Sequence, residues 1–295
     1  MTFKCGHVAL VGQPNAGKST LLNALIGEQL AIVTPKPQTT RHRIVGILNR
    51  EDSQIAFVDT PGFHKPFKPL NSAMVEVVDR TIDDVDIVCL LIAPKLPLTT
   101  IDRQLFERIG ADRCIVVVNK GDTVDARASD DVARKTHDEW GAKETIVVSA
   151  LHGLNVPFLV RSLVEHLPEG QALHSTEGYT EHPVRFLVSE IVREQVFLQM
   201  GDEIPYNATV EIESFKDATD DDPIARIEAA IIVERENQKA MVIGKAGKRI
   251  KEIGTRARVK IEDLIGEKVF LKLVVRVDEE WSSTPQKLRD YGYVL

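Results

Sequence analysis

The first half of the chain alternates short apolar runs with longer stretches of helical periodicity. The apolar runs are rich in Val and Ile and show little polar alternation, which is typical of parallel strands that are buried on both faces. These runs cover residues 7–12, 44–48, 55–59, 87–92, 114–119 and 145–149. Helix-length segments lie between several of them, at residues 18–26, 70–83, 103–109, 126–140 and 156–167. The alternation predicts an α/β fold with a doubly wound, mostly parallel sheet.

A different pattern begins after residue 167. A polar stretch that starts at Pro168 predicts a linker, so we expect one domain at 1–170, a linker at 171–182 and a second domain at 183–295. Beyond the linker we expect a helix, two strands joined by an acidic turn as a hairpin, two short helices and a last strand. These elements are predicted at residues 184–200, 208–216 and 225–234, around 244–247, and at 269–277. The second domain should therefore have an α+β plan.

Charge and composition narrow the class of protein. The 295 residues carry 37 Lys and Arg against 44 Asp and Glu, a formal net charge of −7, which excludes a generally basic coating protein but not a local basic patch. The three cysteines lie in unrelated settings, so we expect neither a disulfide framework nor a zinc site. No apolar run approaches the roughly 20 residues of a membrane-spanning helix, and the N-terminus has no signal-peptide pattern. We expect a soluble intracellular protein.

A phosphate-binding loop is predicted between the first strand and the first helix. Residues 12–19 read Gly-Gln-Pro-Asn-Ala-Gly-Lys-Ser, which fits G-x-x-x-x-G-K-[ST] in the strand–loop–helix context that this motif requires. Backbone N–H groups of such a loop face the phosphates, and the helix N-terminus adds positive potential. We expect Lys18 to bridge the β- and γ-phosphates and Ser19 to coordinate Mg²⁺. The expected nucleotide contacts here are Gly12, Gln13, Pro14, Asn15, Ala16, Gly17, Lys18, Ser19 and Thr20.

A second motif, Asp59-Thr60-Pro61-Gly62, ends the third predicted strand. A carboxylate at this end of a strand beside the phosphate-loop strand can reach a magnesium ion through water. The Gly62 N–H can bond the γ-phosphate and swing away when that phosphate leaves. The sequence D-x-x-G alone is an ordinary turn, but its position after the phosphate-binding loop favours a nucleotide site.

Two further loops are suited to guanine. The run Asn119-Lys120-Gly121-Asp122 closes one strand, and its aspartate can accept two hydrogen bonds from guanine N1 and N2, which adenine does not offer. The asparagine would hold the loop and the base, and the lysine stem would cover the face of the base. The next strand ends at Ser149 and Ala150, where a backbone N–H can meet guanine O6. The order of the motifs on successive strand ends favours a guanine nucleotide over ordinary loop caps.

Together these motifs resemble a GTPase of the translation-factor-like class. The resemblance implies a first switch at residues 38–43, in which Thr40 is the magnesium ligand of the GTP state and Thr39 is its competitor. It also implies GTP and GDP as the nucleotides. The implied catalytic residues are Lys18, Thr40 and Gly62, and the implied residues of the Mg²⁺ site are Ser19, Thr40 and Asp59.

Phe63 follows the second motif, at the place where Ras-like enzymes use a glutamine to orient the attacking water. A phenyl ring makes no such hydrogen bond, so hydrolysis must use another group, or ions and a partner. Asn15 offers one route, because related GTPases with P-N-x-G-K-[ST] loops hold K⁺ with that asparagine. A side chain that merely braces the loop is the alternative.

One segment of this acidic chain is strongly basic. Residues 234–260 hold nine Lys or Arg and three Glu, the charge pattern of a local phosphate contact. Residues 242–250 match the I-G-x-x-G-x-x-I core of a KH domain, in which two glycines let a nucleic-acid backbone approach a tight turn. The expected RNA contacts are Gly244, Lys245, Ala246, Gly247, Lys248 and Arg249. The order α-β-β-α-α-β, which is that of a type II KH domain, disfavours the alternative of a Gly-capped helix with a solvated basic face.

The whole chain resembles the Era family of bacterial ribosome-assembly GTPases. The resemblance rests on G-Q-P-N-A-G-K-S-T, Q-T-T-R-H-R-I-V-G, D-T-P-G-F-H, N-K-G-D, S-A-L-H-G-L-N, the I-G-K-A-G turn and the ending at residues 281–293. Ala16, Gly121, Pro35 and Pro37 depart from the family pattern without removing a chemical group named above. The resemblance implies binding to the 3′ end of 16S ribosomal RNA and to the small ribosomal subunit, not to DNA. It also implies a cytoplasmic protein with peripheral association at the cell membrane.

Our interpretation is a GTP-hydrolysing switch that binds RNA. GTP and Mg²⁺ would order the switches and open the KH groove, and hydrolysis would release the RNA. Phe63 favours one alternative, a GTP-gated RNA-binding module with negligible intrinsic hydrolysis. A GTPase linked to tRNA or to a membrane is another, and the KH segment argues against it.

Overall fold

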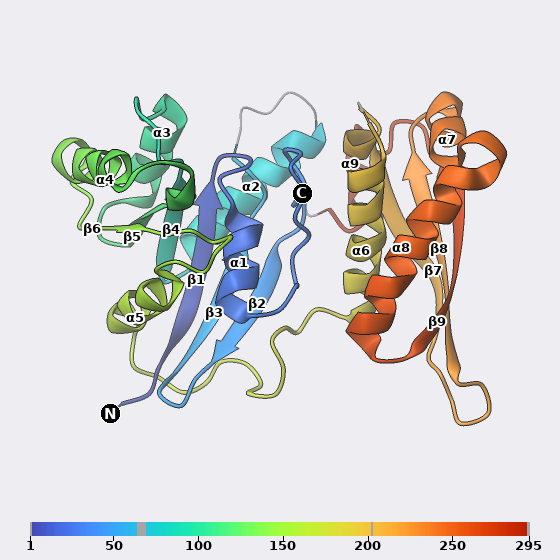
Figure 1. Ribbon diagram of the computed structural model, residues 1–295, viewed down its shortest axis with the longest axis horizontal. Coiled ribbons are helices and arrows are strands. Elements are labelled where there is room, and N and C mark those ends of the chain that lie inside the picture. The colour runs from blue at the N-terminus through green and yellow to red at the C-terminus, as the bar shows by residue number, and fades with distance from the viewer. Residues whose placement is uncertain (1, 64–68, 202, 294–295) are drawn as a thin grey trace. The chain divides into compact units, whose positions relative to one another are not determined.

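A computed structural model describes residues 2–63, 69–201 and 203–293 of the chain. These residues form two compact units: the first runs to Glu181 apart from Pro69 and Leu70, which group with the second unit, and the second continues from His182. A six-stranded sheet organises the first unit and a three-stranded sheet organises the second (Figure 1). Among the described residues, no helix is both long and apolar enough to cross a bilayer.

The sheet of the first unit has the strand order β2-β3-β1-β4-β5-β6. All neighbouring strands run parallel except β2 and β3, which are antiparallel. The strands are β1 (Lys4–Gly12), β2 (Ile44–Asn49), β3 (Ser53–Asp59), β4 (Ile87–Ile92), β5 (Cys114–Val118) and β6 (Glu144–Val147). Every residue of β4 and β5 is buried, as their unbroken apolar runs require.

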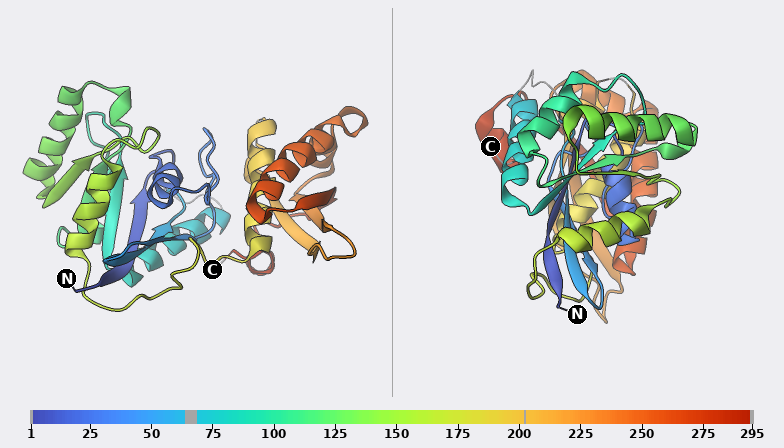
Figure 2. Two further views of the ribbon diagram at one scale, coloured as in Figure 1. Left: turned by 60° about the horizontal axis from the view of Figure 1, so that its bottom comes forward. Right: turned by 90° about the vertical axis from the view of Figure 1, so that its left-hand side faces the viewer.

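Helices cover both faces of this sheet (Figures 1 and 2). One face carries α1 (Lys18–Ile26) and α5 (Val156–His166), which contact each other. The other carries α2 (Pro69–Asp84), α3 (Thr100–Ile109) and α4 (Ala126–Trp140), and their apolar residues join those of the central strands in one buried cluster. Because β1, β3, β5 and β6 run in one direction, the loops that follow them lie at one edge of the sheet, where ligands bind in such folds.

The second unit has the strand order β7-β8-β9. β7 (Ala208–Lys216) and β8 (Ile224–Val233) form the expected antiparallel hairpin, and β9 (Lys268–Val277) runs parallel to β8. α6 (Val184–Gln199) and α8 (Lys248–Ile265) pack against one face of this sheet and against each other (Figure 2). The shorter helices are α7 (Glu236–Ile243) and α9 (Pro285–Asp290).

The predicted fold class, a mostly parallel α/β domain followed by an α+β domain, is confirmed, and two details differ. The helix after the glycine turn, α8, is not short but has 18 residues. Gly254 lies inside it, and a Cβ built there would make only an ordinary contact with Leu273 Cδ1 at 3.4 Å, so the glycine does not end the helix. The sequence pattern also missed α9, whose six residues are too few for a clear helical period.

All three cysteines are reduced and buried. Burial raises the pKa of the Cys114 thiol to about 12, so it stays neutral in the interior of the sheet. Cys5 donates a hydrogen bond to the carbonyl of Gln171. Among the described residues, no cluster of three or more His, Cys, Asp or Glu side chains is suited to a metal ion.

Candidate nucleotide site and nucleic-acid interface

The phosphate-binding loop joins the end of β1 to the start of α1 and is packed tightly against the guanine-side loop. Gly17 has φ +94°, and a Cβ built there would lie 2.2 Å from Asn119 Nδ2. A Cβ on Gly12 would lie 2.4 Å from the carbonyl oxygen of Leu91. Side chains at these two positions would push the loop away from its neighbours, so glycine is required at both.

Lys18 and Asp59 place opposite charges in the interior below this loop. Lys18 is 5% exposed, and its ammonium donates to the carbonyls of Gly12 and Gln13, each at 3.2 Å. Burial lowers the pKa of Lys18 to about 8, and the charge of Asp59 opposes that shift. Burial raises the pKa of Asp59 to about 6, although Lys18 and a hydrogen bond from Ser19 favour its charged form. Both charges are therefore desolvated and suited to a ligand that brings charge of its own.

Three oxygen atoms converge at the start of α1. Ser19 Oγ lies 2.7 Å from Thr40 Oγ1 and 2.6 Å from Asp59 Oδ2, and Thr40 Oγ1 lies 3.3 Å from the same carboxylate oxygen. The other carboxylate oxygen, Asp59 Oδ1, is buried and has no hydrogen-bond partner among the residues that the structure describes. Hydroxyl and carboxylate oxygens are the ligands that Mg²⁺ prefers, so this group fits a magnesium ion and its waters.

Thr39 points elsewhere. Its Oγ1 lies 2.7 Å from Thr34 Oγ1 and donates to the carbonyl of Lys36 at 2.8 Å. Of the two switch threonines that the sequence left open, the structure thus brings Thr40 to Ser19 and turns Thr39 into its own loop. Thr34 belongs to no motif, so no signal in the sequence pointed to this pairing.

Gly62 and Phe63 contact the phosphate-binding loop from the other side. A Cβ on Gly62 would lie 2.8 Å from both N and Cα of Pro14, so only glycine allows this approach. The Phe63 N–H donates to the carbonyl of Gly12 at 3.0 Å. The Phe63 side chain is half-buried against the core under the sheet, where it presents no polar group to the site.

A pocket opens between the phosphate-binding loop and the segment before β2. Its lining residues are Pro14, Asn15, Gly17, Lys18, Ser19, Thr20, Ile32, Val33, Thr34, Lys36, Gln38, Thr39, Thr40 and Gly62. Asn15 is exposed there with φ +63°, and its side chain makes no hydrogen bond to any residue that the structure describes. Gln13 instead turns away and donates to Thr99 Oγ1 and Asp102 Oδ1, a contact with the start of α3 that the sequence did not indicate.

Asn119 ties three loops together on the guanine side. Its amide donates to the carbonyl of Ala16 at 2.9 Å and accepts from the Ala150 N–H at 3.1 Å. A hydrogen bond from Ser149 is the largest of several causes that hold the pKa of Asp122 below its usual range, so this carboxylate is ionised at neutral pH. The predicted residues of this loop pair therefore come together, with the Asp122 carboxylate available as an acceptor.

Gly121 replaces the apolar residue that the guanine motif usually has, and the structure explains the change. A Cβ at this position would lie 2.8 Å from Val147 Cγ1 and 3.3 Å from the carbonyl oxygen of Val148. The Val147 side chain, which comes from β6, therefore fills the space that a side chain at position 121 would need. A single sequence does not show these contacts, because Val147 and Val148 lie far from Gly121 along the chain.

The second candidate site is the turn between α7 and α8. Gly244 has φ +71°, and a Cβ there would lie 2.7 Å from Arg249 Cβ. Ala246 and Gly247 also have positive φ, +51° and +71°, so the turn exposes its backbone between two helices. The predicted RNA contacts at residues 244–249 are thus together on one turn, and Arg249 additionally donates to the carbonyl of Met241 at 2.9 Å.

The positive charge near this turn divides into two groups. Lys245, Lys248 and Lys251 are exposed and form no ion pair with the described residues. The basic residues farther along α8 are paired with acids: Arg256 with Glu252, Arg258 with Glu262, and Lys260 with Glu194. The uncompensated charge therefore concentrates at the turn, where a phosphate backbone would meet it.

A partly apolar groove continues from the turn between α8 and β9. Its lining residues are Ile250, Lys251, Gly254, Thr255, Arg258, Leu271 and Leu273. Apolar walls beside lysines suit unstacked bases next to a phosphate backbone. The sequence predicts apolar residues beside the turn, and the contribution of β9 to the groove became visible only in the structure.

The fold and these two sites define a P-loop GTPase domain followed by a KH-type domain. Residues 7–120 match the family model described as 50S ribosome-binding GTPase, and residues 203–282 match the KH domain model. GTPase Era of Caldanaerobacter subterraneus subsp. tengcongensis is 40% identical over 297 residues, which cover 100% of this chain and 99% of that protein. GTPase Era of Geotalea daltonii is 42% identical over 293 residues, 99% of this chain and 98% of that protein. The chain therefore belongs to the Era family of GTPases.

Two solved structures match nearly the whole chain. A variant of Aquifex aeolicus Era bound to GDP·AlF4⁻ has a TM-score of 0.95 at 36% identity and covers 99% of this chain and 100% of that one. Era in complex with MgGDPNP and nucleotides 1506–1542 of 16S ribosomal RNA has a TM-score of 0.94 at 36% identity, with the same coverage. The predicted family, fold class and GTPase activity are thereby confirmed.

Proposed function

We propose that this chain is a Mg²⁺-dependent GTP switch that binds the 3′ end of 16S ribosomal RNA during assembly of the small ribosomal subunit. The observation that carries the proposal is the convergence of Ser19, Thr40 and Asp59 below a phosphate-binding loop, in a chain whose KH turn presents unpaired lysines. A relative over the full length forms a complex with MgGDPNP and this part of the RNA, which supports both halves of the proposal.

In the nucleotide site, Lys18 would contact the β- and γ-phosphates, and Ser19, Thr40 and the water-linked Asp59 would hold Mg²⁺. A bound Mg²⁺ would neutralise charge on the transferring phosphoryl group. The Gly62 N–H would bond the γ-phosphate, and Asp122 would select guanine. As domain boundaries we propose 1–170 and 183–295 with the linker at 171–182.

Asn15 is proposed as a K⁺ ligand. Its exposed side chain has no partner among the described residues, which is the arrangement expected if an ion completes its contacts and not if it braces the loop. The positive charge of K⁺ would then act on the phosphates, where the Phe63 side chain offers no polar group. Peripheral membrane association, which the family resemblance implied, stays a prediction.

Single-turnover GTP hydrolysis tests the switch. We expect wild-type protein to hydrolyse GTP faster in K⁺ than in Na⁺ buffer, and faster again with an oligonucleotide of the 16S 3′ end. Asn15→Ala should remove the difference between the two ions while GTP still binds. A rate in every buffer no higher than that of Lys18→Ala would instead favour the alternative of a GTP-gated RNA-binding module, which the apolar packing of Phe63 suggests.

A further inference from the structure

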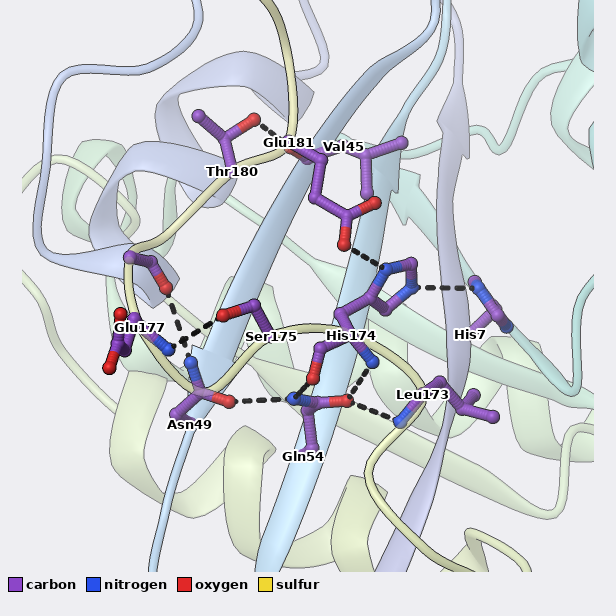
Figure 3. A network of polar contacts seen from close by, with 11 residues as sticks. His7, Val45, Asn49, Gln54, Leu173, His174, Ser175, Glu177, Thr180 and Glu181 are labelled. Atoms are coloured by element: carbon purple, nitrogen blue, oxygen red, sulfur yellow. Dashed lines mark hydrogen bonds and ion pairs between the residues drawn. The ribbon is translucent and has the colours of Figure 1, made fainter.

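The polar segment after α5 does not leave the first unit but lies along its sheet (Figure 3). We call residues 171–181 the strap. Just before it, the Gly170 N–H donates to the carbonyl of Phe3 at 3.0 Å. Near its other end, Thr180 Oγ1 donates to the carbonyl of Val45 at 2.7 Å. The strap is therefore attached from end to end.

Gln54 is the main attachment point. This β3 side chain is 1% exposed and accepts from the N–H groups of Leu173 and His174 at 2.7 and 2.8 Å. Its own amide donates to the carbonyl of His174 at 2.9 Å and to Asn49 Oδ1 at 2.8 Å. A buried amide that both donates and accepts satisfies the strap backbone on both sides, which neither a carboxylate nor an apolar side chain would do.

The strap also covers an open sheet edge. β2 is one of the two edge strands of the sheet, and its Ile47 N–H donates to the carbonyl of Tyr179 at 2.8 Å. On the same strand, the Asn49 amide reaches the carbonyls of Thr176 and Gly178 at 3.3 and 3.2 Å. Only residues 41–43 separate Thr40 from the start of β2, so the first switch leads directly into the strand along which the strap is attached, beginning at Val45.

Docking of the strap decides how long the connection to the second unit is. α6 begins at Val184 with Pro183 as its N-cap, so a docked strap leaves only residues 181–183 between the bond of Thr180 to Val45 and the helix. A released segment of residues 171–183 could extend to roughly 45 Å, at about 3.4 Å per residue. The two states differ in the volume that the second unit can search, and hence in its effective concentration near any ligand of the first.

We propose that residues 171–181 are a releasable strap that is held by Gln54 and the β2 edge, and that rearrangement of the first switch at Thr40 controls its release. Docked, it keeps a short tether to the KH unit; released, it gives a long and flexible one. The docking part rests on the contacts above, whereas the control by Thr40 also rests on the proposed GTP switch.

Amide hydrogen exchange of the full-length protein tests docking. Gln54→Glu removes the amide donor and places a carboxylate beside two carbonyl oxygens, so strap amides should exchange at least about tenfold faster. Gln104→Glu, the same change at an exposed site on α3, should leave them unchanged. Because a buried substitution can unfold β3, Thr180→Val serves as a second variant that removes the hydroxyl bonded to Val45 without burying a charge. Strap amides that exchange equally in wild type and both strap variants, with the fold intact, would overturn the proposal.

To test the control by the switch, amide exchange is measured with GDP and with a non-hydrolysable GTP analogue. Calorimetry first establishes the concentration at which each nucleotide saturates the protein. We expect strap and β2 amides to exchange at different rates in the two complexes, and Thr40→Ala to abolish the difference. Tight binding of both nucleotides without any change in the strap would refute the coupling and leave the GTP switch standing. Failure of either nucleotide to bind would instead contradict the proposed function itself.

Discussion

At the scale of single residues, Gly121 and Val147 are adjacent in space, although they are far apart in the sequence. The absence of a side chain at Gly121 leaves room for the side chain of Val147. The guanine motif around them was predictable, because its residue types and its position at a strand end are both required by the base. The glycine within it looked like an unexplained departure, since the valine that fills its space comes from another strand. The same applies to the choice of Thr40 over Thr39, because it depends on the contact of Thr40 with Ser19 and of Thr39 with Thr34.

The pair gives a first prediction. Gly121→Ala should destabilise the protein by about 1–3 kcal/mol, because its Cβ overlaps Val147 Cγ1 and the neighbouring carbonyl. Val147→Ala should lower the free energy of unfolding because it leaves a cavity. The loss in the double variant should be smaller than the sum of the two single losses, because the methyl group introduced at position 121 can occupy part of that cavity. Urea denaturation of the four proteins measures this coupling. Strictly additive losses would show that the two positions do not share one space.

Asp122 carries the second prediction at this scale. Asp122→Asn replaces an ionised acceptor with an amide that offers a donor toward guanine N1 and N2, so GTP affinity should fall roughly 30-fold or more. Xanthosine nucleotides, which have a carbonyl in place of the N2 amine, should then bind better than guanosine nucleotides. Calorimetry with both nucleotides on both proteins decides the point. Unchanged GTP affinity in Asp122→Asn would mean that this loop does not select the base.

At the scale of elements, unbroken apolar runs and complete helical periods were sufficient to predict where strands and helices begin and end. Strand β4, helices α1 and α4, and strand β7 have the bounds that the sequence predicts. Elements were missed or predicted too short where local signals are weak, as in α9, or where a glycine lies inside a helix without ending it, as Gly254 does in α8. The linker was recognisable as polar, but its docking depends on a Gln54 side chain that lies about 120 positions earlier in the chain.

The turn between α7 and α8 gives the prediction at this scale. Lys245→Asp combined with Ala246→Asp places two carboxylates where phosphates must approach, so affinity for a 16S 3′-end oligonucleotide should fall roughly 100-fold at about 0.1 M salt. The fold should survive, because aspartate tolerates the positive φ that Ala246 already has. The salt dependence of binding should also become shallower.

A matched control separates the turn from overall charge. Lys216→Asp combined with Ala218→Asp makes the same change of charge at the β7–β8 connection, and RNA affinity should stay close to that of wild type. Fluorescence anisotropy at two salt concentrations, with a GTP analogue present, compares the three proteins. Equal losses in both double variants would show that net charge alone drives the binding and that the turn is an ordinary solvated face.

At the scale of the whole molecule, the strap that leads to the second unit contacts the first unit through a pair of histidines, which can titrate. His174 Nε2 lies 3.3 Å from His7 Nε2 on β1, and His174 Nδ1 lies 3.2 Å from Glu181 Oε1. Burial is the largest cause that lowers the pKa of His7 below 6.5, and the charge of His174 lowers it further. Arg43 acts in the same direction, and only Asp86 opposes the shift. Protonation of His7 is therefore unfavourable while the strap is docked.

The sign of the pH dependence follows from this lowered pKa. A released strap lets His7 bind a proton near its ordinary pKa of 6.5, so the released state takes up more protons as the pH falls toward and below that value. Docking should thus be fully stable above about pH 7 and weaken as the pH falls below about 6.5. Protection factors of strap amides at about pH 7.5 and 5.5, corrected for intrinsic exchange, measure it. His7→Gln keeps a polar side chain without the titration and should flatten the dependence, whereas wild-type protection that is equal at both pH values would contradict it.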